Sequence, residues 1–314
     1  MPSFSSDVKN EMARLPLQKD CCERAELAGL LRMGASLTLG AGRALGLAFT
    51  TENAAVARRA LVLLKQMGSV RTEVMVRRSR RLSKTNTYFI RVLPGKVVSA
   101  MIAEMGLSLE NASPEGKKAL FRKKCCRVSY LRGAFLAGGS INRPEASCHL
   151  EYVTTSYPFA ELLHSLLRRL GFPAGITGRK EDCVVYLKEG DAILDFLSML
   201  GAEEAATSFE AVRNVKEVRN QVNRLVNCET ANLGKTANAA ARQVAALRRL
   251  ATGGGLAHLA PGLRAAAEAR LAHPEASLSE LGVHLGVGRS GVNHRLRRLM
   301  ELAAKQEVRC AGER

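Results

Sequence analysis

The sequence predicts an α+β protein, in which a duplicated αββαββα domain is followed by an all-α domain with a helix-turn-helix pattern. Three observations support this. A glycine-centred helical stretch occurs twice, at Leu27–Ser36 and Leu131–Ser140, and similar strand-like and helix-like runs follow each copy. The last sixty residues carry helix-start signals and helical apolar spacing. The expected parts are an N-terminal helix (1–20), the first half (21–110), the second half (111–205), a basic helical connector with a glycine hinge (206–255) and the helix-turn-helix domain (256–314).

The charge balance indicates an anionic partner. The 314 residues include 47 Lys and Arg against 29 Asp and Glu, a formal net charge of +18, which favours nucleic acid or an acidic lipid surface. No apolar stretch approaches the ~20 residues that span a bilayer, and the N-terminus lacks the pattern of a secretory signal. We therefore expect a soluble cytoplasmic protein without membrane attachment.

The eight cysteines do not follow a recognised metal-binding spacing. Cys21–Cys22 and Cys125–Cys126 are adjacent pairs, whereas zinc sites favour C-x2-C, and the other cysteines are scattered. The six histidines form no pair at ligand spacing. We expect reduced cysteines that act as small buried side chains, with no metal, no cofactor and no small-molecule ligand.

The two halves share their register as well as their glycines. Cys22 lies seven residues before Gly29, and Cys126 lies seven before Gly133. The first copy is followed by runs typical of a strand (Leu45–Thr50), a helix (Ala54–Met67), two strands (Val70–Arg77, Thr87–Leu93) and a helix (Lys96–Met105). The second is followed by Cys148–Thr154, Phe159–Leu170, Ala174–Thr177, Cys183–Leu187 and Ala192–Leu200. The second strand of each first pair is weakly signalled, and Gly68 and Gly171 fit left-handed helix caps.

These two stretches resemble the LAGLIDADG motif of homing endonucleases, in which paired helices pack at the centre of a pseudo-dimer above a DNA-binding sheet. The resemblance implies a helix seam at Gly29, Gly133 and Ala137. In that family the penultimate motif position is an acid that binds Mg²⁺, and this chain has Gly34 and Gly138 there. Glycine offers a cation no side-chain oxygen, so we expect no catalytic residues. The glycines alone are equally compatible with ordinary tight helix packing.

The C-terminal signals predict three helices. Pro261 opens a helix that runs through Leu271, and Ser277 with Glu280 forms a capping box for a helix over Leu278–Leu285. After a turn at Gly286–Gly288, apolar residues recur at helical spacing, with Gly282 at the helix contact. The residues expected to bind DNA are Ser277, Arg289, Ser290, Asn293, His294, Arg297 and Arg298. The alternative is a small helical cap with a solvated basic face.

The connector and one loop supply candidate phosphate contacts. Thr207 and Glu210 indicate a capping box, Asn227–Thr230 a break, and Thr236–Leu250 a second helix that ends at a glycine run. The candidate phosphate contacts are Arg77, Arg78, Arg80, Arg81, Lys84, Arg213, Lys216, Arg219, Arg224 and Lys235. A solvated charged face is the alternative for each of them.

The order of these parts resembles the WhiA family of bacterial transcription regulators over nearly the whole chain. The most specific stretches are Tyr130–Ser140, Asn227–Asn232, Ser277–Gly282 and Gly291–Leu296. The resemblance implies roles in sporulation in filamentous actinobacteria and in cell division and chromosome segregation in other relatives. We predict a non-enzymatic, nucleoid-associated transcription regulator that binds specific sequences in double-stranded DNA and has further transcription, division or segregation proteins as candidate partners. The alternatives are an active DNA endonuclease and a non-transcriptional scaffold for division or segregation proteins.

Overall fold

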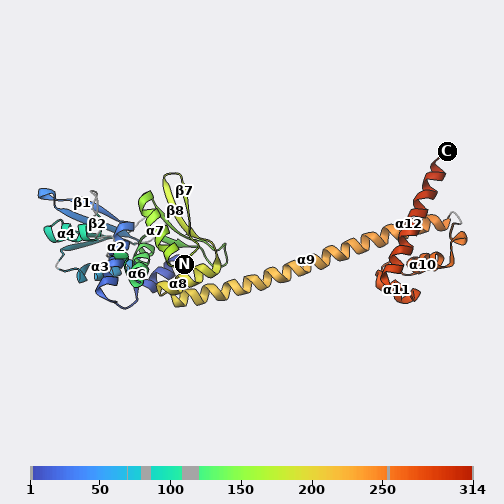
Figure 1. Cartoon of the computed structure of the whole chain (residues 1–314), viewed down its shortest axis with the longest axis horizontal. Helices are drawn as coiled ribbons and strands as arrows, with labels where there is room; N and C mark the ends of the chain where they lie inside the picture. The colour runs from blue at the N-terminus through green and yellow to red at the C-terminus, as the bar shows by residue number, and fades with distance from the viewer. Residues whose placement is uncertain (1–2, 69, 79–85, 108–119, 253–254, 313–314) are drawn as a thin grey trace. The chain divides into compact units, whose positions relative to one another are not determined.

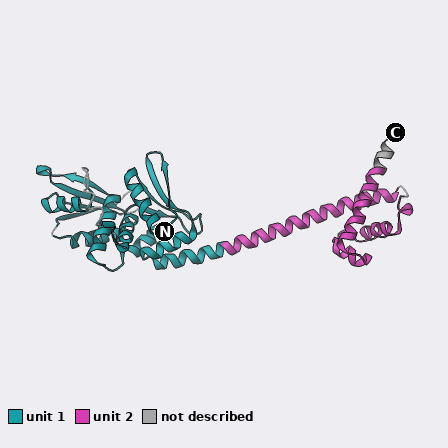
Figure 2. Ribbon diagram, in the orientation of Figure 1, with its two compact units in different colours: residues 1–216 teal, residues 217–314 magenta. Residues whose placement is uncertain are grey.

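A computed structural model describes residues 3–68, 70–78, 86–107, 120–252 and 255–312 (Figure 1). The chain forms two compact units, residues 1–216 and residues 217–314 (Figure 2). Each unit has its own cluster of buried apolar side chains. Within the described residues, no helix combines the length and apolar character needed to cross a bilayer.

The N-terminal unit contains two halves with the same topology. The first consists of α1 (Phe4–Ala13), α2 (Asp20–Gly34), β1 (Ala35–Leu39), a 3₁₀ turn (Ala41–Arg43), β2 (Leu45–Thr51), α3 (Ala54–Gln66), β3 (Thr72–Arg78), β4 (Asn86–Val92) and α4 (Lys96–Glu104). The second consists of α6 (Lys124–Gly138), β5 (Gly139–Ile141), β6 (Leu150–Thr154), α7 (Tyr157–Arg169), β7 (Gly175–Arg179), β8 (Asp182–Leu187) and α8 (Gly190–Leu200). Two antiparallel sheets, β1-β2-β4-β3 and β5-β6-β8-β7, repeat one strand order, which confirms the duplicated fold class.

The weakly signalled strand is the first of each pair, so the expectation that it would be the second is wrong. β1 follows α2 directly, and β5 follows α6 directly. The backbone changes from helical to extended at a single residue, Ala35 (φ −105°, ψ 147°) in one half and Gly139 (φ −75°, ψ 152°) in the other. A sequence window that spans this junction mixes the helical repeat of 3.6 residues with the strand repeat of two residues, so the alternation typical of a strand cannot be recognised.

Glycine ends two helices as expected. Gly68 follows α3 with φ +111°, and Gly171 follows α7 with φ +95°. Side chains with a Cβ rarely adopt this part of conformational space, so glycine allows the chain to turn away from each helix.

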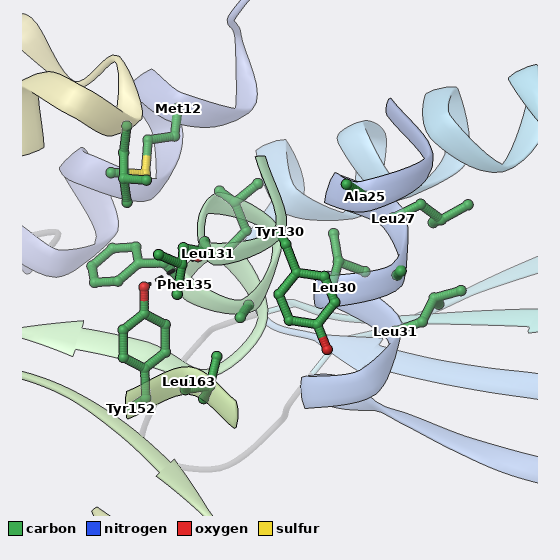
Figure 3. Close-up of a cluster of buried hydrophobic side chains, with 14 of the residues drawn as sticks. Met12, Ala25, Leu27, Leu30, Leu31, Tyr130, Leu131, Phe135, Tyr152 and Leu163 are labelled. Carbon is green, nitrogen blue, oxygen red and sulfur yellow. Dashed lines mark hydrogen bonds between the residues drawn. The ribbon is translucent and has the colours of Figure 1, made fainter. Parts of the chain in front are cut away.

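The two glycine-centred helices form the seam between the halves. A Cβ at Gly29 would strike the backbone carbonyl of Tyr130, and a Cβ at Gly133 would strike that of Glu26. The contacts are reciprocal, as a pseudo-two-fold arrangement requires. Figure 3 shows the buried apolar side chains on both sides of this contact, with Leu30 and Leu31 from α2 and Phe135 from α6.

A buried ion-pair cluster lies at the same seam. Glu26 of α2 accepts two hydrogen bonds from Arg59 of α3, at 2.7 and 3.0 Å, and one from Arg132 of α6 at 3.1 Å. Arg132 also donates to the carbonyl of Leu200 at 2.8 Å, and Arg59 donates to that of Leu15 at 2.5 Å. Each charge is therefore paired and hydrogen-bonded, which is the condition under which charges are tolerated inside a protein.

The C-terminal part of the chain consists of α9 (Glu203–Thr252), a 3₁₀ turn (Gly255–His258), α10 (Pro261–Ala272), α11 (Leu278–Leu285) and α12 (Arg289–Gly312). α9 is one continuous helix, so the predicted break at Asn227–Thr230 is wrong. Asn and Thr cost a helix only about 0.5–0.7 kcal/mol each relative to Ala, and no proline stands in this stretch to end it. The two residues 253–254 of the expected glycine hinge lie outside the described residues.

The predicted helix start at Thr207 is also wrong. The Thr207 hydroxyl donates to the carbonyl of Glu203 at 2.9 Å, as it does inside a helix. The first turn of α9 is capped instead by the carboxylate of Glu11 in α1, which accepts hydrogen bonds from the backbone N–H groups of Glu204 (2.8 Å) and Ala205 (3.0 Å). A cap supplied by a distant residue leaves no local sequence signal.

Candidate nucleic-acid interface

The C-terminal core fixes the orientation of α12. Val292, Leu296 and Leu299 are buried, as their spacing predicts, and they belong to one apolar cluster with Leu281 of α11. The end of α9 also enters this core, through Ala246, Leu247 and Leu250. By their position in the sequence, these three residues fall within the predicted connector. The burial of one stripe of α12 turns its opposite face to solvent.

Local contacts fix both the start of α11 and its packing against the turn before α12. The Ser277 hydroxyl accepts a hydrogen bond from the Glu280 N–H at 3.2 Å, and the Glu280 carboxylate accepts one from the Ser277 N–H at 2.6 Å, which completes the predicted capping box. The hydrogen bond from the Ser277 backbone lowers the pKa of Glu280. A Cβ at Gly282 would lie 2.6 Å from the carbonyl oxygen of Val287, so only glycine permits this approach of α11 to the turn.

The predicted DNA-binding side chains of α12 lie together on its exposed face. All six of them are exposed, namely Arg289, Ser290, Asn293, His294, Arg297 and Arg298. Arg298 is paired with Glu301 at 3.0 Å, whereas the seventh predicted residue, Ser277, is half-buried and engaged in the cap. Arg289 begins the helix, where the backbone N–H groups and the helix dipole favour an anion.

A cleft of about 390 Å³ extends this face toward α9. Its lining includes Lys235 of α9, Ser277 and Ser279 at the start of α11, and Arg289 and Asn293 of α12. Lys235 was predicted as a phosphate contact in a separate connector, and the structure brings it beside the residues predicted to read bases. The predicted phosphate contact and two of the residues predicted to read bases therefore line the same surface.

Two further residues in this cleft were not singled out from the sequence. Arg270 of α10 is 2% exposed and donates to the carbonyls of Ala276 (2.5 Å) and Pro274 (3.4 Å), which fixes the chain between α10 and α11. Burial lowers the pKa of the Arg270 guanidinium. Its Nε and the Oε1 of Gln243 are buried and have no hydrogen-bond partner among the described residues. Gln243 of α9 and Arg270 of α10 line the same cleft only because the fold brings their two helices together.

The sheet of the first half carries part of the predicted basic run. Arg77 and Arg78 are exposed near the end of β3, while Arg80, Arg81 and Lys84 lie outside the described residues. The register places Arg77 opposite Thr87 on the same face of the sheet as Arg91 of β4. Arg91 is exposed and was missed, although strict alternation within β4 would have placed it on the outer face.

Gly34 and Gly138, which are predicted to stand where the nucleases carry metal-binding acids, are surrounded by apolar side chains. A Cβ at Gly34 would lie 2.7 Å from the ring of Phe49 and 3.1 Å from the Cβ of Ala137, and a Cβ at Gly138 would lie 2.5 Å from Met33. Side chains from both halves therefore approach these two glycines, and a carboxylate at either position would require them to move.

One carboxylate, Glu151, lies nearby on β6. It pairs with His149 at 3.0 Å and accepts a hydrogen bond from Ser140 at 3.2 Å. The register places Glu151 opposite Ser140, and in the first half the corresponding partner of Ser36 is Ala48. Glu151 therefore has no carboxylate counterpart at the equivalent position of the first half.

The basic residues at the start of α9 have partners within the N-terminal unit. Arg213 forms an ion pair with Asp191 of α8, and the hydrogen bond from Arg213 lowers the pKa of the Asp191 carboxyl. Lys216 donates to the carbonyl of Ala146 at 2.8 Å. Both residues, predicted to contact phosphate, attach α9 to the second half. Arg219 and Arg224 are exposed along α9.

Comparison with known proteins supports this architecture. The WhiA N-terminal LAGLIDADG-like domain matches residues 20–108, the WhiA LAGLIDADG-like domain matches 127–219, and the WhiA C-terminal HTH domain matches 222–303. A protein from Heliobacterium modesticaldum named "Probable cell division protein WhiA" is 48% identical over 96% of each chain. One of the same name from Desulfitobacterium hafniense is 47% identical, over 97% of this chain and 96% of the relative.

A crystal structure resembles the whole chain. The full-length DUF199/WhiA protein from Thermatoga maritima is 27% identical, with a TM-score of 0.59 over 97% of this chain and 99% of the other.

Proposed function

Because the chain belongs to the WhiA family, we propose that it is a sequence-specific DNA-binding transcription regulator that acts in cell division, chromosome segregation or sporulation. The relatives are named as probable cell division proteins, and the HTH domain of the family covers residues 222–303. Regulation of transcription is our inference from this domain and from the exposed face of α12. The protein would be found in the cytoplasm, associated with the nucleoid.

The observation that carries the proposal is the division of α12 into two faces. Its apolar stripe is fully used in the core, which leaves Arg289, Asn293 and Arg297 exposed along the opposite side. An exposed helix of this kind enters the major groove in helix-turn-helix proteins, where Arg pairs with guanine and Asn with adenine. We assign the contacts with the flanking phosphates to Lys235 and the N-terminus of α12, which border the same cleft.

We assign no cleavage activity to the N-terminal unit. This proposal is supported by Gly34 and Gly138, which offer no side-chain oxygen where the LAGLIDADG resemblance puts metal-binding acids, and by Glu151, which has no acidic counterpart in the first half. A nuclease would cut supercoiled DNA when Mg²⁺ is added. We expect no cutting by the full chain at concentrations that saturate DNA binding.

The test of the DNA-reading face begins with the sequences that the full chain selects from a random duplex library. Arg289→Ala and Asn293→Ala should each weaken binding to the selected site by about 5- to 150-fold, since a base contact contributes about 1–3 kcal/mol. Affinity for unrelated DNA should fall much less, and base preference should relax at a single position for each variant.

Arg58→Ala is a suitable control, because Arg58 is an exposed arginine of α3 in the other unit and its replacement removes the same charge. Its affinity for the selected site should stay close to that of the parent. Equal losses from Arg58→Ala and Arg289→Ala would mean that net charge drives binding, and the assignment of α12 as the reading helix would be wrong.

A further inference from the structure

The two adjacent cysteine pairs converge at one end of the seam. Cys21 and Cys22 lie in the first turn of α2, and Cys125 and Cys126 lie in the first turn of α6. Their four Sγ atoms all lie within 4.8 Å of one another, and those of Cys125 and Cys126 are 4.0 Å apart. The expectation of buried side chains holds for Cys22 and Cys126, whereas Cys21 is half-buried and Cys125 is exposed.

The convergence follows from the packing of the two helices. Gly29 and Gly133 bring the backbones of α2 and α6 into contact, and Cys22 and Cys126 each stand seven residues earlier, two helical turns from that contact. Residues that are seven apart lie on nearly the same face of a helix. The pseudo-two-fold packing of α2 and α6 therefore brings the two cysteine pairs together into one four-sulfur cluster. Neither pair has the C-x2-C spacing of a zinc motif.

From this geometry, we propose that Cys21, Cys22, Cys125 and Cys126 together bind one thiophilic divalent cation, with zinc as the best match, and thereby join the two halves. Zinc with four thiolates is tetrahedral, with metal–sulfur distances of about 2.3 Å, and its ligand sulfurs are then about 3.8 Å apart. The cluster needs only a small contraction to reach that separation. Soft sulfur ligands select zinc over Mg²⁺ or Ca²⁺, and a site closed by four protein ligands is typical of structural rather than catalytic zinc.

The electrostatic surroundings suit a thiolate site. Both pairs lie at helix N-termini, where backbone N–H groups and the helix dipole stabilise negative charge. Four thiolates and one divalent cation carry a net charge of −2. Within two residues of the pairs in the sequence, five basic residues (Lys19, Arg24, Lys123, Lys124 and Arg127) outnumber two acidic ones (Asp20 and Glu23).

The degree of burial fits a metal site that remains reachable. Cys22 is 3% exposed and Cys126 is 2% exposed, whereas Cys21 is half-buried and Cys125 is exposed. The inner two sulfurs are shielded from solvent, and the outer two leave a route by which a cation can enter. Burial raises the pKa of the Cys22 thiol to about 11 and that of the Cys126 thiol to about 12, so a cation must displace both protons when it binds.

The first experiment measures metal content in the full chain, purified under reducing conditions with any affinity tag removed. We expect about one zinc per chain, retained after exhaustive dialysis, and X-ray absorption at the zinc edge should show sulfur ligands at about 2.3 Å. Reconstitution with Co²⁺ alone should give the visible bands of a tetrahedral thiolate site. A protein free of metal that also binds neither Zn²⁺ nor Co²⁺ on addition would overturn the proposal.

Two matched variants identify the ligands. Cys125→Ser alters the exposed member of the cluster and should reduce zinc occupancy by at least tenfold. Cys228→Ser alters an exposed cysteine of α9 outside the cluster and should leave occupancy unchanged. Because Cys125 is exposed, the variant should keep its fold, which circular dichroism verifies. Equal zinc content in both variants would refute the assignment, as would disulfides among the four cysteines under the reducing conditions of purification.

Discussion

Gly133→Ala tests the physical basis of the seam. A Cβ at Gly133 would strike the carbonyl oxygen of Glu26 and lie 2.8 Å from its carbonyl carbon and 2.9 Å from the backbone nitrogen of Leu30. All three are backbone atoms of α2, so no change of rotamer relieves the contact. The helices must separate by roughly 1.5 Å to bring this Cβ to an ordinary van der Waals distance from the oxygen.

The cost follows from this separation. A gap of 1 Å already forfeits up to about half of each dispersion contact, and a buried side chain makes about 40–60 contacts of 0.1–0.2 kcal/mol each. One side chain's share of the contacts along the seam is therefore worth about 2–6 kcal/mol. Alanine regains about 1 kcal/mol through its better helix propensity. We expect the N-terminal unit to lose about 2–4 kcal/mol of unfolding free energy, in the upper range of overpacking effects.

The assay uses the distribution of aromatic residues. All five tyrosines lie between residues 88 and 186, and the chain has no tryptophan, so tyrosine fluorescence during urea denaturation reports only on the N-terminal unit. Gly138→Ala is the control, because its Cβ would meet the flexible side chain of Met33 rather than backbone. We expect Gly138→Ala to cost less than about 1 kcal/mol. If the two variants unfold at the same urea concentration, the close backbone contact is not what requires glycine.

Three further perturbations have expected outcomes. Arg132→Met removes one partner of the buried Glu26 and should lower the unfolding free energy by about 2–4 kcal/mol in the same assay, while a neutral effect would show that the ion pair contributes no net stability. Burial lowers the pKa of Lys9 from 10.5 to about 8, so the buried charged amine destabilises the folded N-terminal unit below pH 8 and no longer does so above pH 10.5. Lys9→Met should therefore raise the unfolding free energy of this unit on the order of 1 kcal/mol at pH 7 and less at pH 10. A gain that is the same at both pH values would contradict this. The hydrogen bond from the Ser277 backbone lowers the pKa of Glu280, so the capping box stabilises the C-terminal unit above the ordinary glutamate pKa and loses this effect as the pH falls through the lowered pKa. The difference in melting temperature between the parent and Glu280→Ala should therefore shrink toward pH 3. A difference that does not shrink would contradict the role of the carboxylate.

Local signals predicted much of this structure. The capping box at Ser277 and Glu280 and the apolar stripe of α12 follow from neighbouring residues, and both are confirmed. The close approach of Gly29 and Gly133 could be inferred because the same spacing occurs twice in the chain. In each case the interaction that fixes the structure is encoded within a few residues or repeated in both halves.

The features that were missed depend on residues far apart in the sequence. The first turn of α9 is capped by Glu11, about 190 residues away, so its start could not be found from Thr207. Lys235 joins the α12 surface only because α9 continues without a break into the C-terminal core. The four-cysteine cluster forms only when two helices from different halves pack together, and no spacing within either pair indicates it.

The most direct test of the proposed regulator is a genome-wide map of bound DNA for the full chain and for the double variant Arg289→Ala, Asn293→Ala. The variant keeps every residue of the C-terminal core, so a change in the map reports on recognition rather than folding. We predict discrete sites for the parent that share a common sequence, and loss of those sites in the variant with general DNA association retained. An unchanged set of sites in the variant would show that α12 does not read the sequence.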